Sequence, residues 1–398
     1  MLVPSERRKA VVVTVLGLLQ ILSWGSTFYL IAVLAGPIVL DTGWPYDHVV
    51  GGLSIGLLVA GIVSPRTGRA IGVYGGRPIL ALSAVLLSLG LALIGTSQTF
   101  VWYLAGWTVI GVGMGTGLYD AAFSALGSIY GKEARSAITA VTLFGGFAST
   151  VCWPFSAYLV EHFGWRSACF VYSAIYLGLA LPLYLLALPR SASAVITQEP
   201  KPQIRAPTLE KGEGVLFAVL ATVLTISAAI LSLVGAHIVT LLQARGLELS
   251  AAVGLGMLIG PSAVGARLVE MFAGNRYHPI WTMIASASLV AVGSCMFLAG
   301  PSVFTLAIIA YASGNGIGSI AKGTLPLALF GAARYPKLMG RLALPIMFAM
   351  ALAPFAGAAV FQYGGADWTF RMFVVMATTN LVLITILWTC SRDMRAQC

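Results

Sequence analysis

Long apolar segments, separated by short polar ones, recur along the whole chain. Each apolar segment has roughly 18 or more residues, the length that a helix needs to cross the hydrocarbon core of a bilayer. Short alternating strands of the kind that build a membrane barrel do not occur. The pattern predicts twelve membrane-spanning helices, near residues 10–36, 48–65, 78–96, 100–128, 137–160, 167–188, 215–242, 251–273, 279–299, 302–329, 341–361 and 369–391.

One polar interval divides these spans into two groups of six. Residues 189–214 are rich in proline, lysine, glutamate and serine, a composition typical of a flexible linker. The expected organisation is therefore a six-helix bundle over 1–188, a cytoplasmic linker over 189–214 and a second six-helix bundle over 215–398. The basic N-terminal residues resemble the start of a signal peptide, but no clear cleavage site follows, so we expect a first membrane helix there.

Composition supports an all-α integral membrane protein. The 398 residues are 59% hydrophobic and only 9% charged, whereas soluble domains have about a quarter of their residues charged. The five cysteines lack metal-ligand spacing, and we expect them to act as small buried apolar residues. The sequence predicts neither a bound metal nor a cofactor.

The distribution of lysine and arginine predicts the orientation. Most of the 23 basic residues fall on one side of the predicted layout, together with both termini and the linker. Cytoplasmic loops are enriched in these residues, so we expect a multi-pass protein of the cell inner (plasma) membrane with both termini in the cytoplasm. The net charge of +10 then reflects topology. It is not gathered on one soluble face, which argues against nucleic-acid binding.

The two halves carry a repeated glycine pattern. Gly113, Gly115 and Gly117 in the fourth span recur at one constant offset in the tenth, which contains the glycines 314, 316 and 318. Repeated halves of six spans are typical of transporters whose substrate site lies between the repeats near the middle of the membrane. Glycines at these spacings also let helices pack closely, so part of the pattern can serve packing alone.

The segment after the second span resembles a loop of the major facilitator superfamily. In "SPRTGRAIGVYGGRPIL", Gly68, Gly75 and Arg77 match the family pattern. Gly72 and Val73 stand where the family usually has aspartate and arginine, so the acidic partner that often locks the cytoplasmic gate is missing. The resemblance covers nearly the whole chain and implies two pseudo-symmetric six-helix bundles. It also implies gating roles for Gly68, Gly75 and Arg77.

A second, looser resemblance concerns the fifth and sixth spans. Residues 145–175, which include Phe163, Gly164, Trp165 and Arg166, are similar to bacterial monocarboxylate-porter-like members of the superfamily. The Gly-Pro signature of drug–proton antiporters is absent from the fifth span, where Trp153 and Pro154 stand instead.

Asp120 is the first candidate for chemistry, because it lies within a predicted span. A charged side chain at the centre of a bilayer costs at least about 2.5–3.5 kcal/mol, so it is a functional candidate by default. Asp120 would suit proton coupling; a static bond to neighbouring hydroxyls or to a cation is the alternative. Lys322 is the second candidate: it would attract an anionic substrate or pair with Asp120, or it would extend toward the cytoplasmic end of its helix as a structural residue.

Arg267 and Glu270 lie three residues apart in the eighth span. This spacing places them on one helix face and favours a local ion pair. Monocarboxylate-porter-like proteins often carry an acid–arginine pair in this span, with the arginine bound to the substrate carboxylate. Here the order is reversed and the pair is near the cytoplasmic end, which favours a gating contact, although Arg267 would suit bidentate carboxylate recognition.

Several single residues complete the candidate site. His237, near the outer end of the seventh span, could change protonation at physiological pH, or it could be structural. The resemblance places the first, fourth, seventh and tenth spans around the substrate cavity. The expected lining residues are Gln20, Trp24, Thr27, Tyr29, Tyr119 and Asn315, each of which could equally serve packing.

The sequence predicts a transporter and no enzyme. Nucleotide-binding loops, zinc-protease motifs and nucleophile elbows are absent, as are the pore-lining charge rings of a channel. We expect a monomeric secondary transporter that moves a small organic anion, driven by protons, by alternating access. The alternative is a proton-driven exporter of toxic or amphipathic compounds, such as drugs or trivalent metalloids. Its partners would be the substrate, protons and the lipid bilayer.

Overall fold

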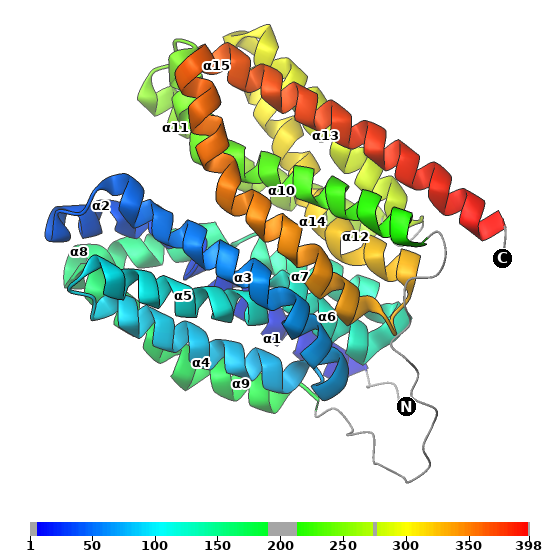
Figure 1. The fold of residues 1–398 in the computed structure, drawn as a ribbon, viewed down its shortest axis with the longest axis horizontal. Helices are drawn as coiled ribbons and strands as arrows, with labels where there is room; N and C mark the ends of the chain where they lie inside the picture. Colours follow the sequence, from blue (N-terminus) through cyan, green and yellow to red (C-terminus); the bar gives the residue numbers. More distant parts are fainter. Residues whose placement is uncertain (1–5, 190–212, 274–276, 397–398) are drawn as a thin grey trace. The chain divides into compact units, whose positions relative to one another are not determined.

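The described residues fold only into helices (Figure 1). The computed structural model describes residues 6–189, 213–273 and 277–396, and the predicted linker lies almost entirely outside them. The chain forms two compact units. The first contains Met1–Gln203 and Phe330–Leu344, and the second contains Ile204–Leu329 and Pro345–Cys398.

The first unit contains the helices of the N-terminal half. In order these are α1 (Glu6–Gly25), α2 (Ile31–Thr42), α3 (Tyr46–Tyr74), α4 (Gly76–Gly95), α5 (Phe100–Gly117), α6 (Tyr119–Tyr130), the short η1 (Gly131–Glu133), α7 (Ala134–Gly145), α8 (Ala148–Ile175), the π-helical η2 (Tyr176–Ala180) and α9 (Leu181–Ala187). Helix α5 packs along both α3 and α4, and α8 packs on α1, α2 and α4.

The second unit contains most of the C-terminal half. Its elements are α10 (Glu213–Ala244), α11 (Leu249–Met257), α12 (Ile259–Ala273), α13 (Pro279–Ala299), η4 (Pro301–Val303), α14 (Phe304–Phe330) and α15 (Tyr335–Ala396). Helix α15 begins in the first unit, because Phe330–Leu344 packs there, and continues into the second. The core of the second unit includes Phe297, Phe304, Phe370 and Phe373.

Ten segments of the described residues are long and apolar enough to cross a membrane. Two of them, Ala134–Ala187 and Tyr335–Cys390, are about twice the length of a single span. Each is interrupted at a glycine with positive φ, Gly164 at +80° and Gly365 at +67°. Side chains other than glycine rarely adopt this conformation. The ten segments therefore cover at least part of each of the twelve predicted spans, and the all-α membrane fold is confirmed.

Several predicted spans are interrupted helices rather than continuous ones. The first span stops at Gly25 and resumes at Ile31 as α2, which contains Pro37. The fourth span breaks between α5 and α6, where Leu118 has an extended backbone with ψ −173°. The eighth span breaks between α11 and α12. Hydropathy averaged over a whole span cannot detect such breaks, because each of them involves only one to five residues.

The repeated glycines make equivalent contacts in the two units. In the first unit, Gly115 packs on the backbone of Ala60 in α3, while Gly113 and Gly117 pack on Leu87 and Ser83 in α4. In the second unit Gly316 packs on the backbone of Ala263 in α12, and both Gly314 and Gly318 pack on Ser286 in α13. A methyl group at Gly115 or Gly316 would collide with a carbonyl oxygen. The glycine pattern is thus a packing device repeated in both units.

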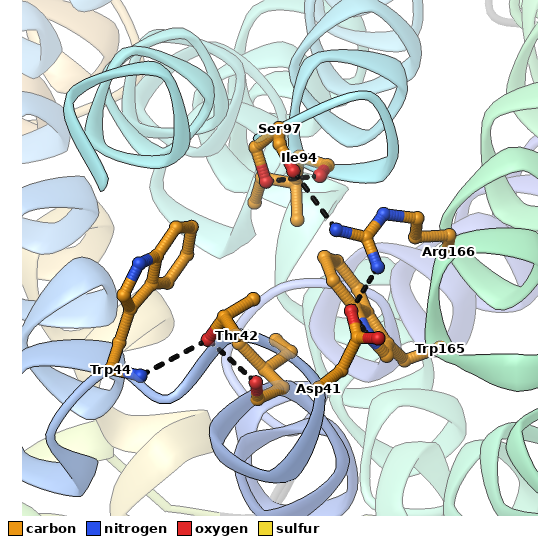
Figure 2. A network of polar contacts seen from close by, with 8 residues as sticks. Asp41, Thr42, Trp44, Ile94, Ser97, Trp165 and Arg166 are labelled. Carbon is orange, nitrogen blue, oxygen red and sulfur yellow. Dashed lines mark hydrogen bonds and ion pairs between the residues drawn. The ribbon is translucent and has the colours of Figure 1, made fainter. Parts of the chain in front are cut away.

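A charged cluster ties three connections of the first unit together (Figure 2). Arg166, just after the break at Gly164, forms an ion pair with Asp41 at the end of α2 and donates to the Ser97 carbonyl at 3.1 Å. The Trp165 indole donates to the same Asp41 carboxylate at 3.1 Å. These hydrogen bonds, that from Arg166 foremost, lower the pKa of Asp41 below its ordinary value of 3.8.

The second unit has an equivalent ion pair with the charges exchanged. Arg245, just after the end of α10, pairs with Asp367, which follows the break at Gly365. The basic residue therefore lies after the first helix of the second unit and the acidic residue after the glycine break, the reverse of the first unit. Arg245 also lies over the ring of Phe370, with its guanidinium carbon 5.5 Å from the ring centre. Both units tie their first and last spans together in this way.

We expect the ion pair in the first unit to tolerate an exchange of its charges. The single substitutions Asp41→Arg and Arg166→Asp each place like charges together and should lower the melting temperature. The double variant recreates the charge order of the second unit and should recover most of that loss, as a double-mutant cycle on purified protein would measure.

The pair of Asp41 and Arg166 predicts a loss of stability in acid. Because the pKa of Asp41 is lowered in the folded state, its contribution to the stability of the folded protein is present above pH 3.8. That contribution is lost as the pH falls through the lowered pKa. The Asp41→Asn variant should lack this part of the pH dependence.

For the charge exchange, a double variant Asp41→Arg/Arg166→Asp that is no more stable than the two single variants would contradict this account of the cluster.

Candidate functional site

Polar and aromatic side chains of the first unit recur along α1 and the turn that follows it. Gln20, Trp24 and Thr27 recur at helical spacing, and Gln20 and Thr27 are fully buried. The Gln20 amide nitrogen donates to the Gly117 carbonyl at 2.7 Å. That carbonyl is at the end of α5, where the helix break removes its ordinary partner. Gln20 therefore supplies the hydrogen bond that the Gly117 carbonyl lacks at the break in the fourth span. The Oε1 atom of Gln20 is itself buried without a hydrogen-bond partner.

Asp120 lies directly after this break. It occupies the first turn of α6, and only 5% of its surface is exposed. The exposed amide groups at a helix N-terminus favour a negative charge there. The Ser124 hydroxyl donates to the backbone carbonyl of Asp120 at 2.6 Å. The break thus places a buried carboxylate at the start of a half-helix, a geometry that membrane transporters use to bind ions and substrates.

Six aromatic rings form a continuous series beside Asp120. Neighbouring ring centres lie 5.1 to 5.8 Å apart, a distance typical of favourable aromatic pairs. The series runs through Trp153, Tyr29, Phe28, Trp24, Tyr119 and Phe123. Three expected lining residues, Trp24, Tyr29 and Tyr119, are therefore in one group. The Trp24 indole nitrogen is buried without a hydrogen-bond partner, so the group keeps one donor for a ligand.

Gly68, one of the residues proposed for gating, lies where Phe330–Leu344 packs in the first unit. Gly68 of α3 contacts the Pro336 carbonyl and the backbone of Gly340, and the fully buried Tyr335 ring lies on Gly127 of α6. Residues 330–344 therefore contact both Gly68, in the segment that resembles the superfamily loop, and α6, the helix that carries Asp120.

The other residues of the motif contribute differently. Gly75 ends α3 with φ at +83°, a conformation that favours glycine. Arg77 lies in the first turn of α4 and is partly exposed. Nothing lies within 4 Å of a side chain at Gly72, the position where the family usually has aspartate.

Arg267 carries the buried positive charge of the second unit. It lies on α12 with 8% of its surface exposed. Its Nε donates to the Gly316 carbonyl at 3.0 Å and to the Ser319 hydroxyl at 3.1 Å, both on α14. Its two terminal Nη groups take part in none of the hydrogen bonds or ion pairs recorded for the described residues. The guanidinium is thus fixed at its Nε edge, and its outer edge, which carries the two Nη groups, makes no hydrogen bond or ion pair among the described residues.

The expected ion pair between Arg267 and Glu270 does not form among the described residues. The two carboxylate oxygens of Glu270 accept hydrogen bonds from Tyr277 at 2.8 Å and from Thr282 at 2.7 Å. Glu270 is 6% exposed. The two residues share a helix face, as their spacing predicts, but different neighbouring helices bind each of them. Sequence spacing could not reveal this, because Ser319 and Thr282 are distant in the chain.

Lys322 and Asn315 lie on α14 and are both partly buried. Lys322 follows Ser319 by three residues, so the two lie on the same helix face. Because Ser319 accepts a hydrogen bond from Arg267, Lys322 lies on the face of α14 that binds Arg267. Asp120 belongs to the first unit and Lys322 to the second, and their pairing stays a prediction.

His237 connects α10 to a proline kink in α15. Its Nε2 lies 2.8 Å from the Pro354 carbonyl, which requires a proton on that nitrogen. Pro354 cannot donate to the Met350 carbonyl, and the Ser232 hydroxyl replaces the lost bond at 2.7 Å. Protonation of the other ring nitrogen would leave the His237 bond intact. This geometry favours the structural role for His237 that the sequence left open.

Comparisons with known proteins agree on the fold. Residues 16–276 match the model of the Major Facilitator Superfamily. The human organic anion transporter MFSD10 has a similar structure, with a TM-score of 0.74 and 16% identity, covering 96% of this chain and 100% of the other. So does the fucose:proton symporter FucP of E. coli, with a TM-score of 0.71, 13% identity and coverage of 96% and 98%.

A third similar structure is the proton:xylose symporter XylE. Its TM-score is 0.74 at 12% identity, with coverage of 94% of this chain and 95% of the other. A search of curated protein sequences found no match. At such low identities, these structures establish only the fold.

Gln20 should be important for stability as well as for binding. In Gln20→Met the Gly117 carbonyl would lose its donor, so the free energy of unfolding should fall by about 1–3 kcal/mol. Gln243→Met, at an exposed position of α10, is the matched control and should leave stability unchanged. The melting temperatures of both variants in one detergent would measure this, and equal values would show that Gln20 does not support the break.

Proposed function

Because the chain belongs to the Major Facilitator Superfamily, we propose that it is a secondary active transporter for a small organic anion. The cotransported ion would be the proton, and the substrate site would open to one side of the membrane at a time. The transporter fold itself follows from the family. The substrate class and the coupling ion are the proposal, and each is supported by a different part of the molecule.

The single observation that carries the anion proposal is the state of Arg267. A buried arginine in an apolar bundle normally has an acidic partner, since an unpaired buried charge is costly. Arg267 uses only Nε for its hydrogen bonds within the protein. The two Nη groups match the two oxygens of a carboxylate, and Lys322 adds charge on the same face of α14. That a protein of similar fold, MFSD10, is described as an organic anion transporter agrees with this assignment.

Asp120 is the proposed site of proton coupling. It is buried, it begins a half-helix, and it lies beside Tyr119 in the aromatic series. FucP and XylE, two proteins of similar fold, are described as proton symporters, which supports the proton as the coupling ion. His237 has the weaker claim, because its recorded bond does not depend on a second proton.

The gating residues and the membrane placement complete the proposal. Gly68, Gly75 and Arg77, with Glu270 in the other unit, would take part in opening and closing. The protein would lie in the cell inner membrane as a monomer with both termini in the cytoplasm, as the distribution of basic residues predicts.

Export of amphipathic compounds is the second candidate function. The six-ring aromatic series in the first unit would suit an apolar or cationic guest, with Asp120 as its counter-charge. The two candidates differ in which charge they require. The anion transporter needs Arg267 and Lys322, whereas the exporter needs Asp120 and the aromatic rings alone. Loss of the gene should then sensitise a native host to a toxic compound only under the second candidate.

The anion proposal predicts a ligand-dependent rise in melting temperature. A panel of small carboxylates, amphipathic drugs, vitamins and metalloid oxyanions should include a carboxylate that stabilises the folded protein. The shift should disappear in Arg267→Met and weaken in Lys322→Ala. Stabilisation only by neutral or cationic compounds, unaffected by both substitutions, would favour the exporter.

The coupling proposal predicts that two modes of transport separate. Asp120→Asn should abolish uptake driven by a proton gradient in proteoliposomes, while exchange of labelled for unlabelled substrate continues, because exchange needs no net proton movement. Glu133→Gln, an exposed carboxylate, serves as the control and should retain both modes. Equal loss of uptake and exchange in Asp120→Asn would argue against a coupling role.

A further inference from the structure

Arg267 and Glu270 carry opposite charges on one helix but form no ion pair with each other among the described residues. They lie three residues apart on α12, and both are more than nine-tenths buried. Side chains at this spacing are neighbours on the helix surface and attract each other more strongly where water is scarce. An ion pair would be the expected outcome, and it would occupy the very groups that a substrate carboxylate needs.

Two hydroxyl groups donate hydrogen bonds to the Glu270 carboxylate instead. Thr282, in the first turn of α13, is almost completely buried and donates to Oε1 at 2.7 Å. Tyr277, two residues before α13, donates to Oε2 at 2.8 Å. Hydrogen bonds to an ionised acceptor are stronger than those between neutral groups. Among the described residues, both oxygens of the carboxylate are therefore bound by hydroxyl groups.

Arg267 is bound in a different direction. Its contacts are with α14, through the Gly316 carbonyl and the Ser319 hydroxyl, whereas the contacts of Glu270 are with α13 and the residues before it. The Ser319 hydroxyl itself donates to the Gly316 carbonyl at 2.7 Å, which fixes its position. The two side chains thus point toward different neighbouring helices.

We propose that Tyr277 and Thr282 are positioning residues that hold Glu270 away from Arg267 and so keep the outer edge of the guanidinium available to the substrate carboxylate. This inference rests on the proposed function, because it assigns specificity for anions to the same Arg267 site. Glu270 then does not compete with the substrate carboxylate for Arg267, although it lies only one helical turn away.

The inference has a physical consequence for variants. Without the two hydroxyls, the Glu270 carboxylate would be buried with no donor, a costly state. The nearest cation on its own helix face is Arg267, so Glu270 should turn to pair with it. The pair would neutralise the arginine and compete with any anion. Glu270→Gln removes the negative charge and should restore the binding site.

The test uses the full-length protein with benzoate as the probe carboxylate. The double variant Tyr277→Phe/Thr282→Val should raise the Kd for benzoate by about tenfold, which corresponds to about 1.4 kcal/mol. The triple variant that adds Glu270→Gln should recover the original Kd to within about threefold. The matched control, Tyr363→Phe/Thr222→Val, removes the same groups at exposed positions of the same half and should leave the Kd unchanged.

A ligand-free measurement tests the same geometry. Double-mutant cycles on the melting temperature, with Arg267→Met and Glu270→Gln, should show little coupling between the two residues in the natural sequence. The coupling should become clearly favourable in the Tyr277→Phe/Thr282→Val background. Absence of that increase would overturn the inference, whatever the result with benzoate.

The outcomes separate this inference from the proposed function. If benzoate fails to bind, or binds Arg267→Met as well as the natural protein, the assignment of Arg267 as the carboxylate site is wrong. If Arg267→Met abolishes binding but the double variant binds normally, or Glu270→Gln does not rescue it, only the role of Tyr277 and Thr282 is wrong. Rescue by Glu270→Gln distinguishes repositioned charge from simple loss of structure.

Discussion

The rest of the structure depends on one constraint, which is that a polar group inside an apolar bundle must find its partner within the protein. The constraint is met repeatedly between helices. Ser88 and Ser173 bind each other and each other's backbone carbonyl, and Ser232 replaces the hydrogen bond that Pro354 removes. Gln20 does the same for the end of α5. Ser232 and Gln20 thus supply a donor to a carbonyl that has lost its helical partner.

The same constraint gives the candidate site its character. Where all polar groups are satisfied, as at Glu270, the protein is locally complete. Where one edge of a group remains unused, as at Arg267, at Oε1 of Gln20 and at the indole nitrogen of Trp24, a ligand can improve the local energy. The first unit offers neutral hydrogen-bonding groups beside aromatic rings, and the second offers positive charge.

The spans, the repeat and the candidate residues could be predicted from the sequence, because hydropathy and spacing are local properties. The glycine pattern even identified equivalent positions such as Gly115 and Gly316, which pack on Ala60 and Ala263. The breaks at Leu118 and after Gly25 were not predictable, since each is short and lies within a long segment whose average hydropathy is that of a membrane span. The partners of Arg267 and Glu270 were also hidden, because they come from other helices. That Phe330–Leu344 packs with the first unit is likewise a property of the tertiary fold alone.

The reversed ion pairs bear on how two similar repeats assemble correctly. Asp41 pairs with Arg166 in one unit and Arg245 with Asp367 in the other. If the last span of one repeat folded onto the first span of the other, two acidic or two basic residues would meet. The mistaken arrangement would thus be penalised by repulsion, while each correct one is rewarded by attraction. The opposite order of the two charges thus favours pairing of the first and last spans within each half over pairing between the halves.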